Sequence, residues 1–246
     1  MLKILYKIYF WLVAVPLYAI ATALTATTVI VGRMFGGEKF FSYYPGMVWS
    51  RLATVLTLCP VKVTGREHIT KGQSYVFVSN HQSAFDIFLI YGHLGVPIKW
   101  MMKKGLEKIP LVGLACKKAG FIFVDNSSAK AAQKSVLEAK EKIKNSGGSS
   151  LIVFPEGGRT KDGHLQAFKR GAYLIAMEMQ LPIVPITLNG TYKVMKMNSF
   201  NIMPHRLEMF IHEALAPPPD MGKEHLQALA DTTRETIFAS LWKEFQ

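Results

Sequence analysis

From residue 61 onward, short apolar runs alternate with stretches whose apolar positions recur at helical spacing. The clearest run, residues 74–79, is almost continuously apolar, which is typical of a strand that is covered on both faces. Because strands that alternate with helices form parallel sheets, this pattern predicts an α/β fold with a mostly parallel central sheet flanked by helices. Other strands are expected at residues 61–64, 98–101, 121–124, 151–154, 183–188 and 207–211.

Helix signals separate these strands. An amphipathic pattern with lysines on its outer face predicts a helix over residues 128–145, and further helices are expected at 168–179 and 225–244. Ser83 suits a helix N-cap, because Asp86 follows three residues later and precedes an apolar run. The strand that ends at residue 79 therefore leads through a short loop into a helix.

The first part of the chain has a different pattern. Residues 8–32 contain no charged side chain, with Lys3 and Lys7 before them and Arg33 after them. At about 1.5 Å per helical residue, this stretch is long enough to cross a hydrocarbon core of roughly 30 Å. A cleaved signal peptide fits poorly, because the apolar part is too long and no convincing cleavage site follows it.

Two modes of membrane attachment stay open. The segment can span the bilayer, or it can form a helical hairpin in one leaflet together with residues 40–58. Aromatic residues cluster in both halves, as is typical of segments at a membrane interface. A buried core helix is disfavoured, because no neighbouring segment looks able to cover so much apolar surface. We therefore divide the chain into a membrane-associated segment, residues 1–60, and an α/β domain, residues 61–246.

Composition agrees with this division. The 246-residue chain is 50% hydrophobic, and its mean hydropathy of +0.18 is higher than a soluble domain usually has. Its net charge of +12 favours an anionic partner, such as a phospholipid surface, an acidic carrier protein or a phosphorylated substrate. Nucleic acid fits less well, because the lysines are dispersed and are not interleaved with exposed aromatic residues. Cys59 and Cys116 give no disulfide framework, and no histidine has a partner at zinc-ligand spacing.

The first candidate site follows the apolar run at residues 74–79. Asn80 and His81 come directly after it, and Asp86 lies five residues beyond the histidine. Residues five apart on one continuous helix point in directions roughly 140° apart, so the pair must combine a loop residue with a residue of the first helical turn. A carboxylate that holds one ring nitrogen fixes the tautomer and leaves the other nitrogen free to accept a proton. Such a pair can activate a substrate hydroxyl as a nucleophile.

Two other interpretations of this stretch compete. Asp86 can be only the end of a capping box, with His81 as an ordinary loop residue, and in a chain with seven histidines the spacing alone is weak evidence. Ser83 can also be considered as a nucleophile. Its capping position and the lack of a Gly-x-Ser-x-Gly elbow argue against that role.

The second candidate site follows another apolar run, residues 151–154. Gly157 and Gly158 permit positive φ angles and the close approach of backbone N–H groups to an anion. Arg159 adds a permanently charged guanidinium that can hold a phosphate through two hydrogen bonds. Glu156 can orient this arginine or bond a substrate hydroxyl. The alternative is an ordinary strand-exit turn with a surface ion pair.

Taken together, the two sites resemble the glycerolipid acyltransferase family, specifically its 1-acylglycerol-3-phosphate acyltransferases. The resemblance rests first on Asn80-His81-x4-Asp86 and on Phe154-Pro155-Glu156-Gly157-x-Arg159. The matching region runs from about residue 61 to residue 188. Its further blocks, in family order, are Lys103-Lys104-Gly105-Leu106, Ile109-Pro110-Leu111-Val112-Gly113, Gly120-Phe121-Ile122-Phe123-Val124, Phe168-Lys169-Arg170-Gly171 and Leu181-Pro182-Ile183-Val184-Pro185.

The resemblance implies transfer of a fatty acyl group from a thioester to the sn-2 hydroxyl of lysophosphatidic acid, which gives phosphatidic acid. It implies that His81 is the general base and that Asp86 orients it. Arg159 and Lys104 are then phosphate ligands. Glu156 and Gly157 shape the acceptor site, and supporting roles fall to Asn80, Gly120, Gly158 and Pro185.

The same resemblance implies the partners of the enzyme. No cofactor and no metal is needed, and the co-substrate is an acyl-carrier protein or coenzyme A thioester. The enzyme meets lysophosphatidic acid at an anionic phospholipid membrane, and nucleic acid is not a partner. The expected location is the cytoplasmic face of a membrane, which is the inner membrane in a bacterium.

One position departs from the family pattern. The second block of the family usually ends in an arginine, whereas this chain has Asn126 after Asp125. A phosphate ligand is therefore missing, or Lys103, Lys104 or Lys130 replaces it. Two alternatives follow: an acyltransferase with another acceptor, such as glycerol-3-phosphate or another lysophospholipid, or a non-catalytic membrane protein that binds anionic lipid.

Overall fold

The structure is a computed structural model. It describes the chain except for residues 126–127, 129–136, 138–140, 142–148, 218–219 and 221. The helix predicted over 128–145 falls almost wholly outside the described residues, as do Asn126 and Lys130.

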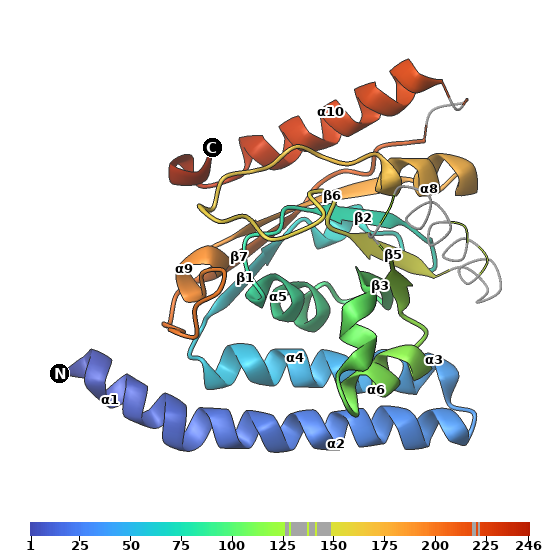
Figure 1. Cartoon of the computed structure of the whole chain (residues 1–246). Coiled ribbons are helices and arrows are strands. Elements are labelled where there is room, and N and C mark those ends of the chain that lie inside the picture. Colours follow the sequence, from blue (N-terminus) through green and yellow to red (C-terminus); the bar gives the residue numbers. More distant parts are fainter. Residues whose placement is uncertain (126–127, 129–136, 138–140, 142–148, 218–219, 221) are drawn as a thin grey trace.

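In the described part of the chain, a seven-stranded sheet has the order β1-β7-β6-β2-β5-β3-β4 (Figure 1). Neighbouring strands are parallel except β6 and β7, which are antiparallel. The predicted fold class, a mostly parallel sheet flanked by helices, is therefore confirmed. The strands are β1 (Val61–Thr64), β2 (Val76–Ser79), β3 (Ile98–Lys103), β4 (Ile122–Val124), β5 (Ser150–Val153), β6 (Ile183–Asn189) and β7 (Leu207–Ile211).

Helices cover both faces of this sheet, and the described ones are α1 (Leu2–Tyr9), α2 (Val15–Met34), α3 (Glu38–Phe41), α4 (Tyr44–Leu56), α5 (Phe85–His93), α6 (Val112–Lys118), α8 (Gly171–Met179), α9 (Thr191–Val194) and α10 (Lys223–Ala239). In Figure 1, α8 and α10 lie on one face, and α5 lies on the other with α4 and α2 beneath it. The central strands β2, β5 and β6 are consequently buried along their whole length, whereas the edge strand β1 alternates between half-buried and exposed positions.

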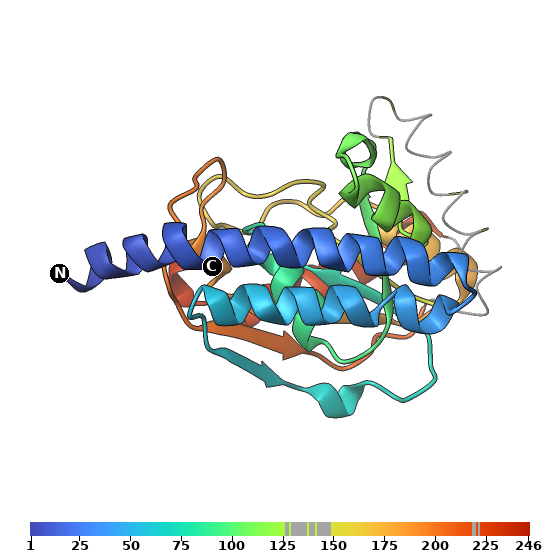
Figure 2. The same cartoon turned by 90° about the horizontal axis from the view of Figure 1, so that it is seen from below.

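The N-terminal helices form a layer of their own (Figure 2). A π-helical turn, Phe10–Ala14, joins α1 to α2, so that helical structure runs without a break from Leu2 to Met34. Helix α4 runs back alongside α2, as Figures 1 and 2 both show. The two are joined by a hydrogen bond from Trp49 Nε1 to Thr22 Oγ1 at 2.8 Å.

This layer leaves a long apolar surface uncovered. Among the described helices, Leu2–Met34 is long and apolar enough to cross a membrane by length and composition. Within this helix, 17% of an apolar 18-residue stretch is buried. Large apolar side chains are exposed along it, among them Leu5, Leu12 and Leu24. Such a surface is compatible with membrane contact. The division of the chain into domains 1–60 and 61–246 stays a prediction.

The strands lie where the apolar pattern predicts them, with differences of one or two residues at their ends. Two helices differ more. Helix α8 begins at Gly171 and not at residue 168, and in the loop before it the N–H of Lys169 donates to the carbonyl of Pro155 at 2.8 Å. Helix α10 ends at residue 239 and not at 244, because the chain turns so that the N–H of Trp242 donates to the side chain of Asn189 at 3.0 Å.

Candidate active site

The two predicted sites come together at one edge of the sheet. Strands β2 and β5 are adjacent and parallel, with Val78 paired to Val153, so their carboxyl ends open onto the same edge. The loop after β2 carries His81, and the loop after β5 carries Glu156 and Arg159. Parallel pairing thus brings together residues that lie far apart in the sequence.

His81 and Asp86 form a hydrogen-bonded pair. His81 lies in the loop and Asp86 in the first turn of α5, and His81 Nδ1 is 2.8 Å from Asp86 Oδ2. The same carboxylate oxygen accepts the backbone N–H groups of Gln82, at 2.7 Å, and Ser83, at 2.8 Å. Because this oxygen acts as an acceptor in all three bonds, Nδ1 donates the hydrogen bond, and Nε2 is the ring nitrogen left to accept a proton.

Asp86 combines two roles that the sequence leaves as alternatives. Its carboxylate accepts the N–H of Ser83 as in a capping box, although the N-cap of α5 is Ala84 and not Ser83 as predicted, and the same oxygen holds the ring of His81. The hydroxyl of Ser83 donates to the carbonyl of Met195 at 2.6 Å and accepts from the N–H of Phe85 at 3.2 Å. Ser83 is therefore engaged in the fold of the loop, and His81 is the group available to a substrate.

The β5 loop holds His81 from a second side. The rings of His81 and Phe154 are stacked, with 3.9 Å between their centroids and 8° between their planes. The N–H of His81 donates to Glu156 Oε1 at 2.7 Å, and its carbonyl accepts the N–H of Thr160 at 3.0 Å. With ring and backbone both fixed and the side chain partly exposed, His81 is held in one orientation at the sheet edge.

Glu156 has different partners from those that the sequence predicts. It is buried, and its two oxygens accept the backbone N–H groups of His81 and Gln166, at 2.7 Å and 3.1 Å, instead of bonding Arg159. Burial raises the pKa of Glu156 to about 7, although these two N–H groups act in the opposite direction. Glu156 thus fastens the loop that carries His81 to the loop after β5.

Arg159 and Lys169 bring positive charge to this edge. Arg159 is half-buried, and neither side chain forms a hydrogen bond or ion pair with any residue that the structure describes. The ammonium of Lys169 packs over Gly157, where an added β-carbon would collide with Nζ. Gly157 also has a φ of +75°, which L side chains rarely adopt. Sequence reasoning missed Lys169, although it belongs to the Phe168–Gly171 block quoted above.

Lys104 lies farther along the same edge, just beyond the end of β3. Strand β5 separates β3 from β2, so Lys104 is one strand removed from the His81 loop. Its exposed ammonium is 3.3 Å from Asp125 Oδ2. Any anion that bound Lys104 would therefore compete with Asp125 for this lysine.

The predicted supporting residues lie in different surroundings. Asn80 is buried, and its amide bridges β2 to β6 through hydrogen bonds of 2.9 Å and 2.8 Å to the backbone of Leu188. Gly158 lies in the turn between Glu156 and Arg159. Gly120 precedes the amino end of β4, and Pro185 is buried within β6. Asn80 and Gly158 thus adjoin the site, and the other two belong to the frame of the sheet.

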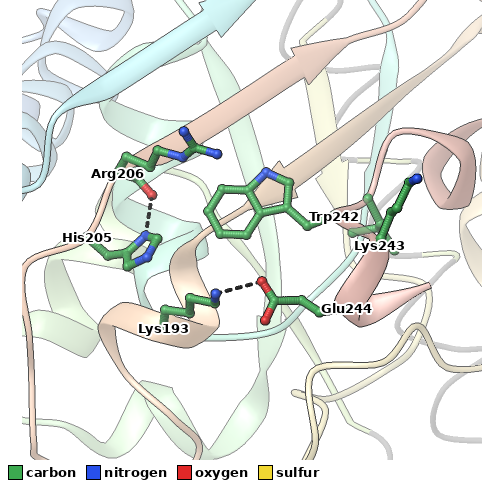
Figure 3. Close-up of a pocket in the computed structure, with 7 residues that line it drawn as sticks. Lys193, His205, Arg206, Trp242, Lys243 and Glu244 are labelled. Carbon is green, nitrogen blue, oxygen red and sulfur yellow. Dashed lines mark hydrogen bonds and ion pairs between the residues drawn. The ribbon is translucent and has the colours of Figure 1, made fainter.

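A pocket of about 750 Å³ lies apart from these residues, between α9 and the end of the chain (Figure 3). Lys193 Nζ and Arg206 Cζ approach the Trp242 ring, at 5.3 Å and 5.0 Å from its centroid. Lys193 also pairs with Glu244 at 2.6 Å, and Arg206 lies 3.6 Å from Glu208. The charges of this pocket are therefore largely satisfied within the protein, and His81 is not among its lining residues.

Potential metal ligands are dispersed. Among the residues with described positions, no group of three or more His, Cys, Asp or Glu side chains could hold a metal ion. Cys59 and Cys116 are free thiols, the first buried and the second half-buried. The expectation that no metal or cofactor takes part stays a prediction.

Fold and site together define a class of protein: an α/β protein with a histidine–aspartate pair at one edge of its sheet, beside cations that pair with no described residue. Such a site suits a substrate that carries both a hydroxyl and an anionic group. Comparison with known proteins then gives the family. Residues 60–189 match the Acyltransferase family, and the chain belongs to that family.

Known relatives show how far the similarity extends. A chloroplastic 1-acyl-sn-glycerol-3-phosphate acyltransferase of Arabidopsis thaliana is 29% identical over 209 residues, covering 80% of this chain and 58% of that protein. The corresponding acyltransferase alpha of Ovis aries is 33% identical over 183 residues, covering 72% and 61%. The crystal structure of the 1-acyl-sn-glycerophosphate (LPA) acyltransferase from Thermotoga maritima matches with 25% identity, a TM-score of 0.77 and 98% coverage of both chains. The chain spans a little over half the length of the first curated relatives.

Proposed function

We propose that this protein transfers a fatty acyl group from an acyl thioester to the sn-2 hydroxyl of 1-acylglycerol-3-phosphate, which yields phosphatidic acid. The observation that carries the proposal is the 2.8 Å hydrogen bond between His81 Nδ1 and Asp86 Oδ2. With Arg159 unpaired nearby, this base suits an acceptor that has both an alcohol and a phosphate. The names of the relatives, which describe acyltransferases for this acceptor, support the choice.

Arg159 and Lys169 are the proposed phosphate ligands. Both adjoin the turn after β5, and neither is paired with an acidic side chain in the described part of the chain. Arginine can bind two phosphate oxygens at once, and lysine adds a compact charge. Lys169 thus supplies a second cation in a chain that has Asn126 where the family usually has arginine. Lys104, which is tied to Asp125, is the more distant contributor.

The reaction follows from the free Nε2 of His81. Nε2 accepts the proton of the sn-2 hydroxyl as the hydroxyl oxygen attacks the carbonyl carbon of the thioester. Asp86 stabilises the imidazolium that forms. When the tetrahedral intermediate collapses, the C–S bond breaks and the imidazolium returns its proton to the leaving thiolate, giving an ester and a free thiol. A phosphate held by the cations keeps the hydroxyl near the base, so positioning supplies much of the rate.

The donor in this proposal is an acyl thioester of an acyl-carrier protein or of coenzyme A, with no cofactor. Both donors carry negative charge, which suits a protein with a net charge of +12. Both present the same thioester carbon to the acceptor, so the steps above are the same for either.

The N-terminal helices are proposed to attach the enzyme to one leaflet of a membrane as a hairpin. Arg33, at the end of α2, donates to the carbonyl of Lys118 at the end of α6 at 2.7 Å, and α4 packs along α2. A helix that is held along its length in this way lies flat on the domain, which favours the hairpin over a transmembrane span (Figures 1 and 2). We assign the cytoplasmic face, where Lys and Arg residues of membrane proteins accumulate.

An assay that crosses donors with acceptors tests the proposed activity. Purified protein in detergent micelles receives carrier-protein or coenzyme A thioesters of one chain length, each with lysophosphatidic acid, glycerol-3-phosphate or lysophosphatidylcholine. We expect phosphatidic acid from the first acceptor, and its loss in His81→Ala. A preference for another acceptor would replace the proposed specificity. No transfer by the parent protein to any acceptor would favour a non-catalytic protein that binds anionic lipid.

A further inference from the structure

A loop outside the catalytic site lies beside the N-terminal helix. It joins α9 to β7, and in Figure 1 it descends toward the helix that begins the chain. Residues 198–202 of this loop line a pocket of about 470 Å³ together with Lys7, Phe10 and Trp11. That volume lies within the range of roughly 300–1,000 Å³ that is typical of pockets for small molecules.

The loop is folded so that Phe200 projects from it. The side chain of Phe200 is 77% exposed. At the base of the loop, the N–H of Met203 donates to the carbonyl of Val194 at 3.0 Å. At the tip, the N–H of Ile202 donates to the carbonyl of Phe200 at 3.1 Å, and Asn198 has a φ of +58°. Because these bonds pre-form the tip, it can bind a partner with a small loss of conformational entropy.

A single exposed phenylalanine is ordinary on a protein surface, but Phe200 is not isolated. Trp11, which lines the same pocket from the facing helix, is 55% exposed. Through Trp11, the apolar surface of the loop is continuous with the uncovered surface of Leu2–Met34. Lys7, which lines the pocket, places positive charge at the border of this surface. Aromatic rings beside lysines are the composition that suits the interface between acyl chains and anionic headgroups.

We propose that residues 196–203 form a second membrane-binding element, and that the pocket between this loop and the N-terminal helix holds one anionic phospholipid of the bilayer. Lys7 receives the phosphate, with the amides of Asn198 and Asn201 as further hydrogen-bond donors. The acyl chain lies along Trp11 and Phe200. The inference rests on the membrane attachment proposed above and adds to it a second point of contact.

Hydrogen bonds connect this loop to the proposed catalytic residues. The loop begins at Met195, whose carbonyl accepts the hydroxyl of Ser83 at 2.6 Å, and the N–H of Ser83 donates to Asp86. Seating the loop in the headgroup region therefore sets the height of the His81 loop above the bilayer. The proposed acceptor is itself a component of that bilayer.

An environment-sensitive fluorophore on single cysteines tests the inference. In a background with Cys59 and Cys116 replaced by alanine, the label is attached at Phe200→Cys, at Leu12→Cys as positive control and at Phe238→Cys as negative control. Phe238 is an exposed residue of α10, on the other face of the sheet. With vesicles of phosphatidylglycerol and phosphatidylcholine, we expect blue-shifted emission at positions 200 and 12, quenched by lipids with brominated acyl chains, and no change at 238.

The outcomes separate this inference from the function proposed above. A response at position 12 without one at position 200 would contradict membrane binding by residues 196–203, but not membrane attachment by the N-terminal helix. No response at either position would remove the membrane attachment itself. A response at position 200 only when lysophosphatidic acid is added would assign the pocket to the acceptor and overturn its assignment to a bilayer phospholipid.

Steady-state kinetics of variants that keep Cys59 and Cys116 give a second measurement. In Phe200→Ser, we expect the KM for long-chain lysophosphatidic acid in vesicles to rise several-fold, with unchanged kinetics on a short-chain acceptor dissolved in water. Phe238→Ser is the matched control and should change the kinetics on neither the long-chain nor the short-chain acceptor. Lys7→Gln should weaken binding to phosphatidylglycerol vesicles and not to pure phosphatidylcholine vesicles. Equal effects of Phe200→Ser on both acceptors, or none on either, would contradict the inference.

Discussion

Two described histidines bond an aspartate that lies five residues away along the chain, and they differ in their surroundings. His81 Nδ1 is 2.8 Å from Asp86, and His225 Nδ1 is 2.7 Å from Asp220. The side chain of Asp86 is 0% exposed, whereas that of Asp220 is 60% exposed. Water competes for the exposed pair and screens it, while the buried carboxylate holds its ring in one orientation. The same spacing can therefore fix a histidine ring in one place and form a weak, solvent-screened pair in another.

Asparagine in place of Asp86 tests this difference. An amide oxygen can still accept the backbone N–H groups, but the neutral side chain no longer stabilises a positively charged imidazole. We expect kcat to fall by on the order of 100-fold or more, with little change in KM, in steady-state assays on lysophosphatidic acid. Asp220→Asn removes the exposed pair and should leave both constants unchanged. Full turnover by Asp86→Asn would leave Asp86 as a capping residue alone.

Lys169 and Arg170 are neighbouring cations, and Lys169 is the one that packs over Gly157. Methionine at position 169 keeps most of the length of the side chain and removes its charge. We expect the KM for lysophosphatidic acid to rise by about tenfold, with a smaller effect on kcat, because one charged hydrogen bond to the phosphate is lost. Lys169→Arg should restore most of the affinity, and Arg170→Met should not change it. An unaltered KM in Lys169→Met would remove this lysine from the phosphate site.

At the scale of elements, Glu156 links the loop after β2 to the loop after β5, and its burial makes the stability of the fold depend on pH. Burial raises the pKa of Glu156 to about 7 in the folded protein, from an ordinary value of 4.5. The folded state therefore binds this proton more tightly than the unfolded chain does. The resulting stability is complete below about pH 4.5 and is lost as the pH rises through about 7. The difference corresponds to on the order of 3 kcal/mol.

Glutamine in place of Glu156 abolishes this titration. Between about pH 4.5 and about pH 7, we expect the free energy of unfolding of the wild type to fall relative to that of Glu156→Gln, because only the wild type must ionise a buried acid. Urea unfolding in detergent micelles, followed by circular dichroism, measures the difference. Glu224→Gln, on the exposed first turn of α10, should keep the pH profile of the wild type. Parallel profiles for wild type and Glu156→Gln would contradict the raised pKa.

Elements and contacts that depend on local pattern could be predicted from the sequence. Buried parallel strands need continuous apolar runs, so the positions of β2, β5 and β6 followed from hydrophobicity alone. The bond between His81 and Asp86 spans five residues, so their spacing was enough to suggest it. Asp86 was harder to interpret, because the same carboxylate oxygen serves the cap and the ring.

Contacts between distant segments could not be predicted in this way. Glu156 accepts the N–H of His81 from 75 residues away, and a backbone donor leaves no mark on the pattern of side chains. Lys169 reaches Gly157 because residues 168–170 precede α8, although their apolar spacing suggested a helix. The sequence therefore singled out His81 and Arg159, whose roles stay predictions. Only the folded chain showed that Lys169 packs over Gly157 and that Glu156 links the two loops.

At the scale of the whole molecule, charge and apolar surface contribute differently to membrane binding. The net charge of +12 attracts anionic lipid over the Debye length, which is about 10 Å at 0.1 M salt and about 3 Å at 1 M. Apolar contact contributes roughly 25 cal/mol per Å² of buried surface and is not screened by salt. An enzyme anchored through Leu2–Met34 and a protein held only by its charge therefore respond differently to ionic strength.

Vesicle flotation at increasing ionic strength distinguishes these two cases. Between about 0.1 M and about 1 M NaCl, we expect binding to phosphatidylglycerol vesicles to weaken and then to level off, because the apolar face of α1 and α2 still holds the protein. Leu12→Asp should lower this salt-resistant fraction, and Phe238→Asp should not. Complete release at 1 M would mean that charge alone retains the protein. Because lysophosphatidic acid resides in the same leaflet, activity on vesicles should follow the bound fraction at every salt concentration.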